Sequence, residues 1–179
     1  YWASRINSSI DGTNFILHNE ENRYEVGSLL LGKYQVYILL PAIICGVKLG
    51  MQIENAILPL SSFILPPGRM SLIPAVSGAT MIDSSYNSSP SALKEALEIL
   101  KEVGANTRKV AVLGNMNELG EEEEKLHKVI GETIPKYTDI LITVGSLAEL
   151  FAEKAIEKAL RKSSCLNLKP QKQPPSSLK

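Results

Sequence analysis

Four stretches between residues 68 and 127 carry the residue types that bind charged substrates. Gly68-Arg69-Met70 follows a Pro66-Pro67 break, and Asp83-Ser84-Ser85-Tyr86-Asn87 follows a short β-type run. Gly114-Asn115-Met116-Asn117-Glu118 follows a second, more apolar β-type run, and His127 comes a few residues later. Each strand therefore releases the chain into a polar loop at its carboxyl end. Because ligands bind at that edge of open α/β sheets, we expect the site there.

The elements that must position these loops alternate between strand and helix. Ser89 can cap a helix, Pro90 suits its first position and Gly104 can close it. Alternating strands and helices with short connections predict a parallel, Rossmann-like sheet, so the fold class is α/β. The expected elements are strand 79–82, helix 89–103, strand 110–113, a helix from about 121, strand 140–144 and helix 147–160.

The N-terminal third has a different pattern. Residues 1–31 favour short strands separated by polar turns, and helices are expected at 33–49 and 52–63. Cys45 lies in the apolar part of the first helix, which predicts a small buried side chain.

Proline and glycine also mark the expected domains. Pro66-Pro67-Gly68 predicts a boundary between a first domain, 1–67, and a second domain, 68–161. Past Arg161 the chain is polar and contains prolines without periodicity, which predicts a disordered tail over 162–179.

Composition narrows the classes of function. The 19 basic and 19 acidic residues balance, so no nucleic-acid-binding surface is expected. The apolar run 36–47 is interrupted by Pro41 and is too short to span a bilayer, which takes about 20 residues. No secretory signal is recognisable, and we expect a cytoplasmic protein. The two histidines and two cysteines have no metal-ligand spacing, so no metal site is expected.

Residues Gly27 to Tyr34 approximate a P-loop. That motif ends in Ser or Thr, because the hydroxyl holds Mg²⁺. Here the position is Tyr34, and three leucines fill the loop. A strand leading into a helix is the expected structure, and the chain alone is expected not to hydrolyse ATP.

The order of the motifs resembles a known family. GRM, IDSSYNSSP, VAVLGNMNELG and then His127 are similar to the Mur ligases of peptidoglycan synthesis. Within that family the pattern is most similar to the subfamily that adds D-alanyl-D-alanine to UDP-N-acetylmuramoyl-tripeptide. That subfamily has GRM, DDSYNANPDSM, VLGDMLELG and H-x-x-VG in this order. The resemblance extends from about Phe15 to about Phe151.

The resemblance implies an ATP-dependent amide ligase. Such enzymes activate a carboxylate as an acyl phosphate, which an amine then attacks. ATP and Mg²⁺ are the implied cofactors, and UDP-muramoyl-tripeptide and D-alanyl-D-alanine are the implied substrates. The family's P-loop and metal ligands would lie upstream of this chain. The chain would hold the back of the central ATPase domain and a truncated Rossmann-like C-terminal domain.

The resemblance also assigns roles in the nucleotide site. Arg69 would be a catalytic residue that clamps the nucleotide phosphates, and its alternative is a solvated arginine beside a linker. Asp83 would contact the ribose or nucleotide, and its alternative is to accept amides within its own turn. Asn87 would bind nucleotide or substrate, or else cap its loop.

Asn115, Glu118 and His127 are the implied substrate-binding residues. The family has Asp at the position of Asn115 and a second Asp at Ser84, so carboxylates are absent there. His127 could equally pack on its helix. These departures leave an alternative function, a non-catalytic Rossmann-like module that binds a nucleotide or a partner.

Overall fold

The computed structural model describes residues 1–20 and 22–169. They form two compact units, of which unit 1 is Tyr1–Tyr86 and unit 2 begins at Asn87. The sequence placed a domain boundary earlier, after Pro67. The main chain turns at these prolines, where the Arg69 amide donates to the Pro66 carbonyl oxygen. Residues 68–86 nevertheless belong to the first compact unit.

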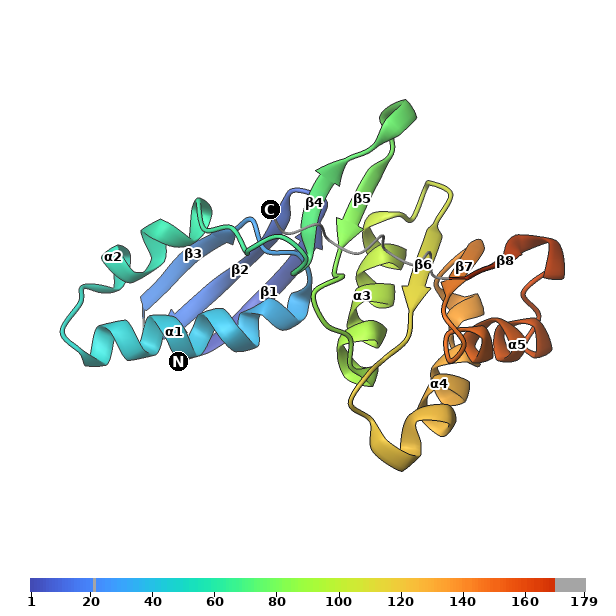
Figure 1. Ribbon diagram of the computed structural model, residues 1–179. Coiled ribbons are helices and arrows are strands. Elements are labelled where there is room, and N and C mark those ends of the chain that lie inside the picture. The colour runs from blue at the N-terminus through green and yellow to red at the C-terminus, as the bar shows by residue number, and fades with distance from the viewer. Residues whose placement is uncertain (21, 170–179) are drawn as a thin grey trace, which may run out of the picture. The chain divides into compact units, whose positions relative to one another are not determined.

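Unit 1 is built on a three-stranded antiparallel sheet in the order β1-β2-β3, formed by the short strands that were predicted within residues 1–31. The strands are β1 (Trp2–Ser9), β2 (Gly12–Asn19) and β3 (Asn22–Ser28). Helix α1 (Val36–Lys48) lies across one face of this sheet (Figure 1). Phe15, Leu17 and Val26 of the sheet pack in one buried cluster with residues of α1.

Helix α1 is apolar on all sides. Val36, Leu39 and Ile43 are buried against the sheet, whereas Tyr37 is 83% exposed. Cys45 is also exposed, so the expectation of a buried thiol was wrong, because the helix turns that position away from the sheet. The second helix is shorter than expected: α2 (Ile53–Ile57) passes into a 3-10 turn, Leu58–Ser61, that holds a proline near its start. No helix among residues 1–20 and 22–169 is long and apolar enough to cross a membrane.

The strand expected at 79–82 does not join the parallel sheet. Instead β5 (Thr80–Asp83) pairs antiparallel with β4 (Ser71–Pro74), with Leu72 opposite Ile82. The physical reason is proximity, since closing a short loop costs less entropy than pairing with a distant strand. The expectation of three successive strand-helix units was therefore wrong for the first of them.

Unit 2 confirms the α/β class with a parallel sheet. Helix α3 (Pro90–Val103) begins as expected: Ser89 Oγ accepts the Ala92 amide at 3.3 Å. The sheet has the order β6-β7-β8 and all its pairs are parallel. Its elements are β6 (Val110–Gly114), α4 (Glu123–Gly131), β7 (Ile140–Val144), α5 (Glu149–Glu157) and β8 (Cys165–Leu168).

The helices of unit 2 pack on one face of this sheet. Ala111, Leu113 and Leu141 share a buried cluster with residues of α3, α4 and α5. Helices α4 and α5 approach closely at Gly131, where a Cβ would lie 2.9 Å from the Phe151 carbonyl oxygen. The opposite face is apolar but open. Val112 is 63% exposed there, and Leu166, paired next to Ile142, is 53% exposed.

The disordered tail was expected to begin at residue 162, but the chain still forms regular structure there. Residues Lys162–Ser164 form a 3-10 turn and β8 extends the sheet beside β7. Thr143 Oγ1 donates a hydrogen bond to Asn167 Oδ1 at 2.7 Å, which secures this pairing. A strand of four residues is too short to show periodicity, and so the pattern missed it. Residues 170–179 lie outside the described residues.

The starts of β6 and β7 are tied together by Asp139. Its Oδ2 accepts the Lys109 amide at 2.8 Å and lies 3.1 Å from Lys109 Nζ. The amide hydrogen bond, followed by the one from the Lys109 side chain, holds the pKa of Asp139 below its usual value. The ionised carboxylate therefore favours the folded unit.

We predict that Asp139→Asn lowers the stability of unit 2 at pH 7, and that this difference shrinks in acid. The folded pKa is depressed, so the contribution is present above the unfolded value of about 3.9 and is lost as pH falls through the folded value. Urea denaturation at pH 7, 5 and 3 measures it, with Glu98→Gln in an exposed helical pair as control. An unchanged difference from pH 5 to pH 3 would contradict the role of the charge.

Candidate functional site

The first and second motifs meet in unit 1, at the base of the β4–β5 hairpin. Gly68 adopts a left-handed φ of 79°, and its carbonyl oxygen accepts the Tyr86 amide at 3.1 Å. Its own amide donates to Ser71 Oγ at 3.2 Å. A Cβ on Gly68 would lie 3.2 Å from the Tyr86 nitrogen, so glycine permits this close approach. The turn therefore brings Arg69 beside the loop that follows β5.

Arg69 stacks on an aromatic ring. Its guanidinium carbon lies 4.1 Å from the centroid of the Tyr86 ring. Such a cation–π stack uses the face of the guanidinium and leaves its N–H groups, which lie in the plane, available to an anion. No carboxylate in the described parts of the chain forms an ion pair with Arg69. The arginine is thus oriented but not neutralised.

Asp83 ends β5 opposite Ser71 and accepts the Ser85 amide on Oδ1 at 3.0 Å. Hydrogen bonds from the Ser85 side chain and amide, together with the Gly68 backbone, hold the pKa of Asp83 below its usual value. The carboxylate is therefore anionic at neutral pH. The local role considered from the sequence is present, because Asp83 does accept an amide within its own turn.

Asn87 also makes a local contact. Its Oδ1 accepts the Ser88 amide at 2.8 Å, directly before the capping residue of α3. This is the loop-capping alternative for Asn87.

In unit 2, Asn115 ties the two loops at the carboxyl ends of β6 and β7. Its Oδ1 accepts the Ala148 amide at 2.9 Å, at the start of α5. Gly145 has a φ of 110°, and a Cβ there would lie 2.5 Å from the same oxygen. An amide oxygen does what the family's carboxylate could do at this contact, namely accept one amide hydrogen bond.

His127 holds the β6 loop to α4 from inside the unit. The Met116 amide donates to its Nε2 at 3.0 Å, so Nδ1 carries the hydrogen that is donated to the Glu123 carbonyl oxygen at 2.6 Å. The ring is fully buried and lies 4.7 Å from the Phe151 ring. Both ring nitrogens are used by main chain, so His127 positions the loop and does not present a group to substrate in this conformation.

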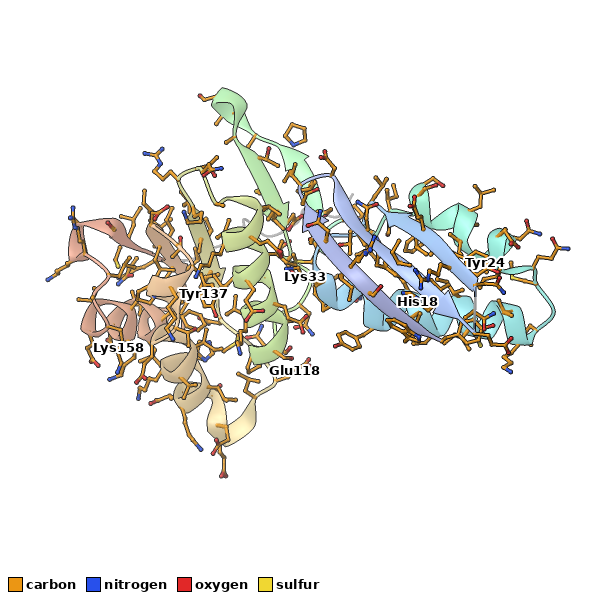
Figure 2. All side chains as sticks on the ribbon, turned by 180° about the vertical axis from the view of Figure 1, so that it is seen from behind. His18, Tyr24, Lys33, Glu118, Tyr137 and Lys158 are labelled. Carbon is orange, nitrogen blue, oxygen red and sulfur yellow. The ribbon has the colours of Figure 1, made fainter. Side chains whose placement is uncertain are left out.

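Glu118 lies exposed in the same loop (Figure 2). It adopts a left-handed φ of 62°, which non-glycine residues rarely do. The neighbouring Gly120, at 58°, takes the same conformation without a steric penalty. Glu118 is thus a strained, exposed acid in a loop whose Asn115 and Met116 are fixed by hydrogen bonds.

Five of the six predicted residues thus fall into two groups. Arg69 and Asp83 lie together in unit 1, whereas Asn115 and His127 hold one loop in unit 2 with Glu118 exposed on it. Asn87, the sixth, accepts an amide within its own loop at the start of unit 2. The sequence pattern did not single out Tyr86, which stacks on Arg69, or Gly145, which lies against Asn115. An aromatic within a run of serines and a glycine directly after a strand were the available signals.

A surface depression of unit 2, of about 580 Å³, lies elsewhere. It is bordered by alternating charges of α4 and by Lys154 of α5. Several of these charges pair with one another, as Lys128 does with Glu124 at 3.0 Å. None of the predicted residues borders it, and its ion-paired wall is typical of a solvated helix surface.

The fit to ATP and Mg²⁺ is partial. Arg69 and Asp83 could contact phosphate and ribose, but no group of three or more His, Cys, Asp or Glu among the described residues could hold a metal ion. In the P-loop-like segment, Leu30 and Leu31 are buried. The Gly32 amide donates to Ser8 Oγ at 3.0 Å. That segment belongs to the core of unit 1 and offers no cradle for phosphates.

Comparison with known proteins identifies the family. The family model described as "Mur ligase, glutamate ligase domain" matches residues 68–172. The chain belongs to the Mur ligase family. The resemblance drawn from the four motifs is therefore confirmed, and the match includes Arg69, Asp83 and the loop held by His127.

Two curated relatives match this Mur ligase chain over most of its length. UDP-N-acetylmuramoyl-tripeptide–D-alanyl-D-alanine ligase of Bacillus subtilis (strain 168) is 34% identical over 158 residues, which is 88% of the chain and 34% of the relative. The enzyme of the same name from Escherichia coli (strain K12) is 26% identical, over 86% of the chain and 36% of the relative. The chain therefore spans about a third of the length of these relatives.

Solved structures show the same fold. MurF from Acinetobacter baumannii matches with a TM-score of 0.80 at 24% identity, over 92% of the chain and 35% of that protein. UDP-N-acetylmuramate-alanine ligase from Thermotoga maritima matches with a TM-score of 0.73 at 16% identity, over 94% of the chain and 37% of that protein. At these identities the likeness concerns the fold.

We predict that Gly145→Ala destabilises unit 2 by about 2 kcal/mol, because alanine is strained at this φ and its Cβ displaces Asn115. In an Asn115→Ala background there is no Asn side chain for the new Cβ to displace. The loss of stability in the double variant should therefore be smaller than the sum of the two single losses by more than about 0.5 kcal/mol. Urea denaturation of the four proteins of this cycle measures the coupling. Strict additivity would show that the two loops are independent.

We predict that His127→Ala lowers the stability of unit 2 by about 3 kcal/mol or more. The change leaves a buried cavity and strands the Met116 amide and the Glu123 carbonyl oxygen. The control is Lys125→Ala on the same helix, whose exposed pair with Glu122 should contribute about 0–1 kcal/mol. A His127→Ala protein as stable as the control would show that the ring is not needed for the loop.

Proposed function

We propose that the chain contributes one side of the nucleotide and substrate site of an ATP-dependent amide ligase. The reaction would add D-alanyl-D-alanine to UDP-N-acetylmuramoyl-tripeptide in the cytoplasm, as the names of its curated relatives suggest for the substrates. The observation that carries this proposal is the Arg69 guanidinium held at 4.1 Å over Tyr86 without an acidic partner among the described residues.

The chemistry requires positive charge near a phosphoryl group. ATP supplies the phosphoryl group that activates the tripeptide carboxylate, and negative charge spreads over the phosphate oxygens as it transfers. A preorganised guanidinium stabilises that charge more than it stabilises the bound substrate. Because Tyr86 already restricts Arg69, little side-chain entropy is lost when an anion binds. Arg69 is therefore assigned the clamp on the nucleotide phosphates.

Asp83 is assigned a contact with the ribose. It is anionic, lies beside the Arg69 turn through the Gly68–Tyr86 hydrogen bond, and is rigidly placed by Ser85. A carboxylate can accept hydrogen bonds from the two hydroxyls of a ribose. Asn87 would then act on the loop itself, since its amide oxygen already accepts the Ser88 amide.

In unit 2 the exposed Glu118 is assigned to the incoming dipeptide, whose ammonium group it could hold. Asn115 and His127 would act indirectly, by fixing the loop that carries Glu118. The phosphate cradle and the Mg²⁺ ligands that such a ligase needs are not found among the described residues, and we expect the chain alone to form no amide bond.

The test places the motifs in a working enzyme. Residues 68–160 replace their counterpart in a complete ligase of this subfamily, and ATP-dependent amide formation is measured. Arg69→Ala should lower kcat about a hundred- to a thousandfold, as expected for a lost charge contact in the transition state. Asp83→Ala should mainly raise the KM for ATP, by about tenfold or less, as expected for one hydrogen bond.

Two further variants sharpen this test. Tyr86→Leu should lower kcat partially, because Arg69 stays but loses its orientation. Arg108→Ala, an exposed arginine outside the motifs, should leave both parameters unchanged. If Arg69→Ala and Asp83→Ala both behave like Arg108→Ala, the motifs serve the fold and the non-catalytic module is the better function.

A further inference from the structure

The sheet face of unit 1 that lies opposite α1 carries a cluster of polar and cationic side chains. Trp2, His18 and Arg23 are aligned across the three strands, because Trp2 is opposite His18 and His18 is opposite Arg23. Figure 2 shows this side of the sheet, with His18 labelled on β2. A depression of about 370 Å³ lies here. It is lined by Ser4, Arg5, Ile16, His18, Arg23, Tyr24 and Glu25.

A β-bulge directs Arg5 to this depression. Ser4 is opposite Ile16 and Asn7 is opposite Asn14, so Arg5 and Ile6 together face one residue of β2. Arg5 has a left-handed φ of 50°, which costs a non-glycine residue conformational energy. Bulges are common where a strand must redirect a side chain. Here the bulge adds a second guanidinium to the side of the sheet that carries Arg23.

His18 is fixed at the centre of the cluster. Its Nε2 lies 2.7 Å from Ser4 Oγ, and its ring stacks on Trp2 with 3.6 Å between centroids and an interplanar angle of 3°. The ring is 8% exposed, whereas Trp2 is 57% exposed. A buried imidazole thus stacks on an indole and hydrogen-bonds a hydroxyl, in the depression that Arg5 and Arg23 also line.

The positive charge of this cluster is not neutralised within the described residues. Neither Arg5 nor Arg23 has a carboxylate within ion-pair distance there, although Glu25 borders the depression. Burial and then the charges of Arg23 and Arg5 lower the pKa of His18. Arg5 and Arg23 border the same depression as His18, so an anion bound there would offset their positive charge.

We propose that this depression binds a small oxyanion, a phosphate or a carboxylate, between the guanidiniums of Arg5 and Arg23. The Ser4 hydroxyl becomes a third donor when His18 Nε2 carries a hydrogen and donates it to the Ser4 oxygen, as in the protonated ring. Two guanidiniums that border one depression can each donate paired hydrogen bonds to the oxygens of an anion bound in it. The residues that line it are not those of the Arg69 turn, and the proposal does not rest on the proposed ligase reaction.

Trp2 makes the proposal directly measurable, because it is the only tryptophan of the chain. Inorganic phosphate is titrated into the full chain at constant ionic strength and neutral pH, and the Trp2 emission is followed. A bound anion favours protonation of His18, and a protonated imidazole stacked on an indole quenches its emission. We expect a saturable decrease. A parallel titration with acetate distinguishes a carboxylate from a phosphate ligand.

The variants are Arg23→Gln and Arg5→Gln, with Arg108→Gln of unit 2 as the matched control. Loss of one charge-assisted pair should raise the half-saturating concentration about tenfold or more. Circular dichroism confirms that each variant is folded, and Arg23→Gln, on a regular strand, keeps the test valid if the bulge variant unfolds. No saturable change with either anion, or equal weakening by Arg108→Gln, would overturn the proposal.

Discussion

The loop that follows β6 depends on one buried imidazole. His127 satisfies a main-chain donor in the loop and a main-chain acceptor in α4 at the same time, at 3.0 and 2.6 Å. Buried main-chain groups without partners are costly, so a different side chain would release this loop from the helix. The loop after β7 is linked to the same segment. Asn115 lies directly before the anchored Met116, and it fixes the loop after β7 through Ala148.

The two groups of motif residues differ in how their polar atoms are used. Asn115 and His127 hydrogen-bond to main-chain groups, so they fix the position of a loop. Arg69 and Asp83 keep their charge, because a π face and a short turn restrict them without neutralising them. The motifs therefore contain two kinds of residue, namely side chains that remain charged and side chains whose hydrogen bonds fix the main chain of a loop. Asn at position 115, where the family has Asp, still supplies an oxygen that accepts the Ala148 amide hydrogen bond.

Both units also leave apolar surface uncovered. Tyr37 of α1 and Val112 of the parallel sheet are 83% and 63% exposed. Helices that are apolar on all sides are normally buried, and parallel sheets are normally covered on both faces. These surfaces occur in a chain that spans about a third of the length of its curated relatives.

Much of the architecture was determined by local sequence. Ser89, Pro90 and Gly104 predicted α3 almost to the residue, and strand 140–144 was predicted with its observed bounds. The four ordered motifs were enough for the family, since each is a few contiguous residues with its own composition. The physical reason is that caps, turns and apolar runs act between residues a few positions apart.

Tertiary structure decided what depends on distant partners. The sequence predicted that β5 is a strand, but not which strand it pairs with. In the structure it pairs with β4, and β8 is the third strand of the parallel sheet. The sequence showed His127 on a helix, but only the packing of α4 against Phe151 buried its ring. It showed Arg69 beside two prolines, but Tyr86 reached the guanidinium because a glycine let the two main chains approach. Contacts across long stretches of chain depend on the free energies of all alternative pairings, which no local pattern contains.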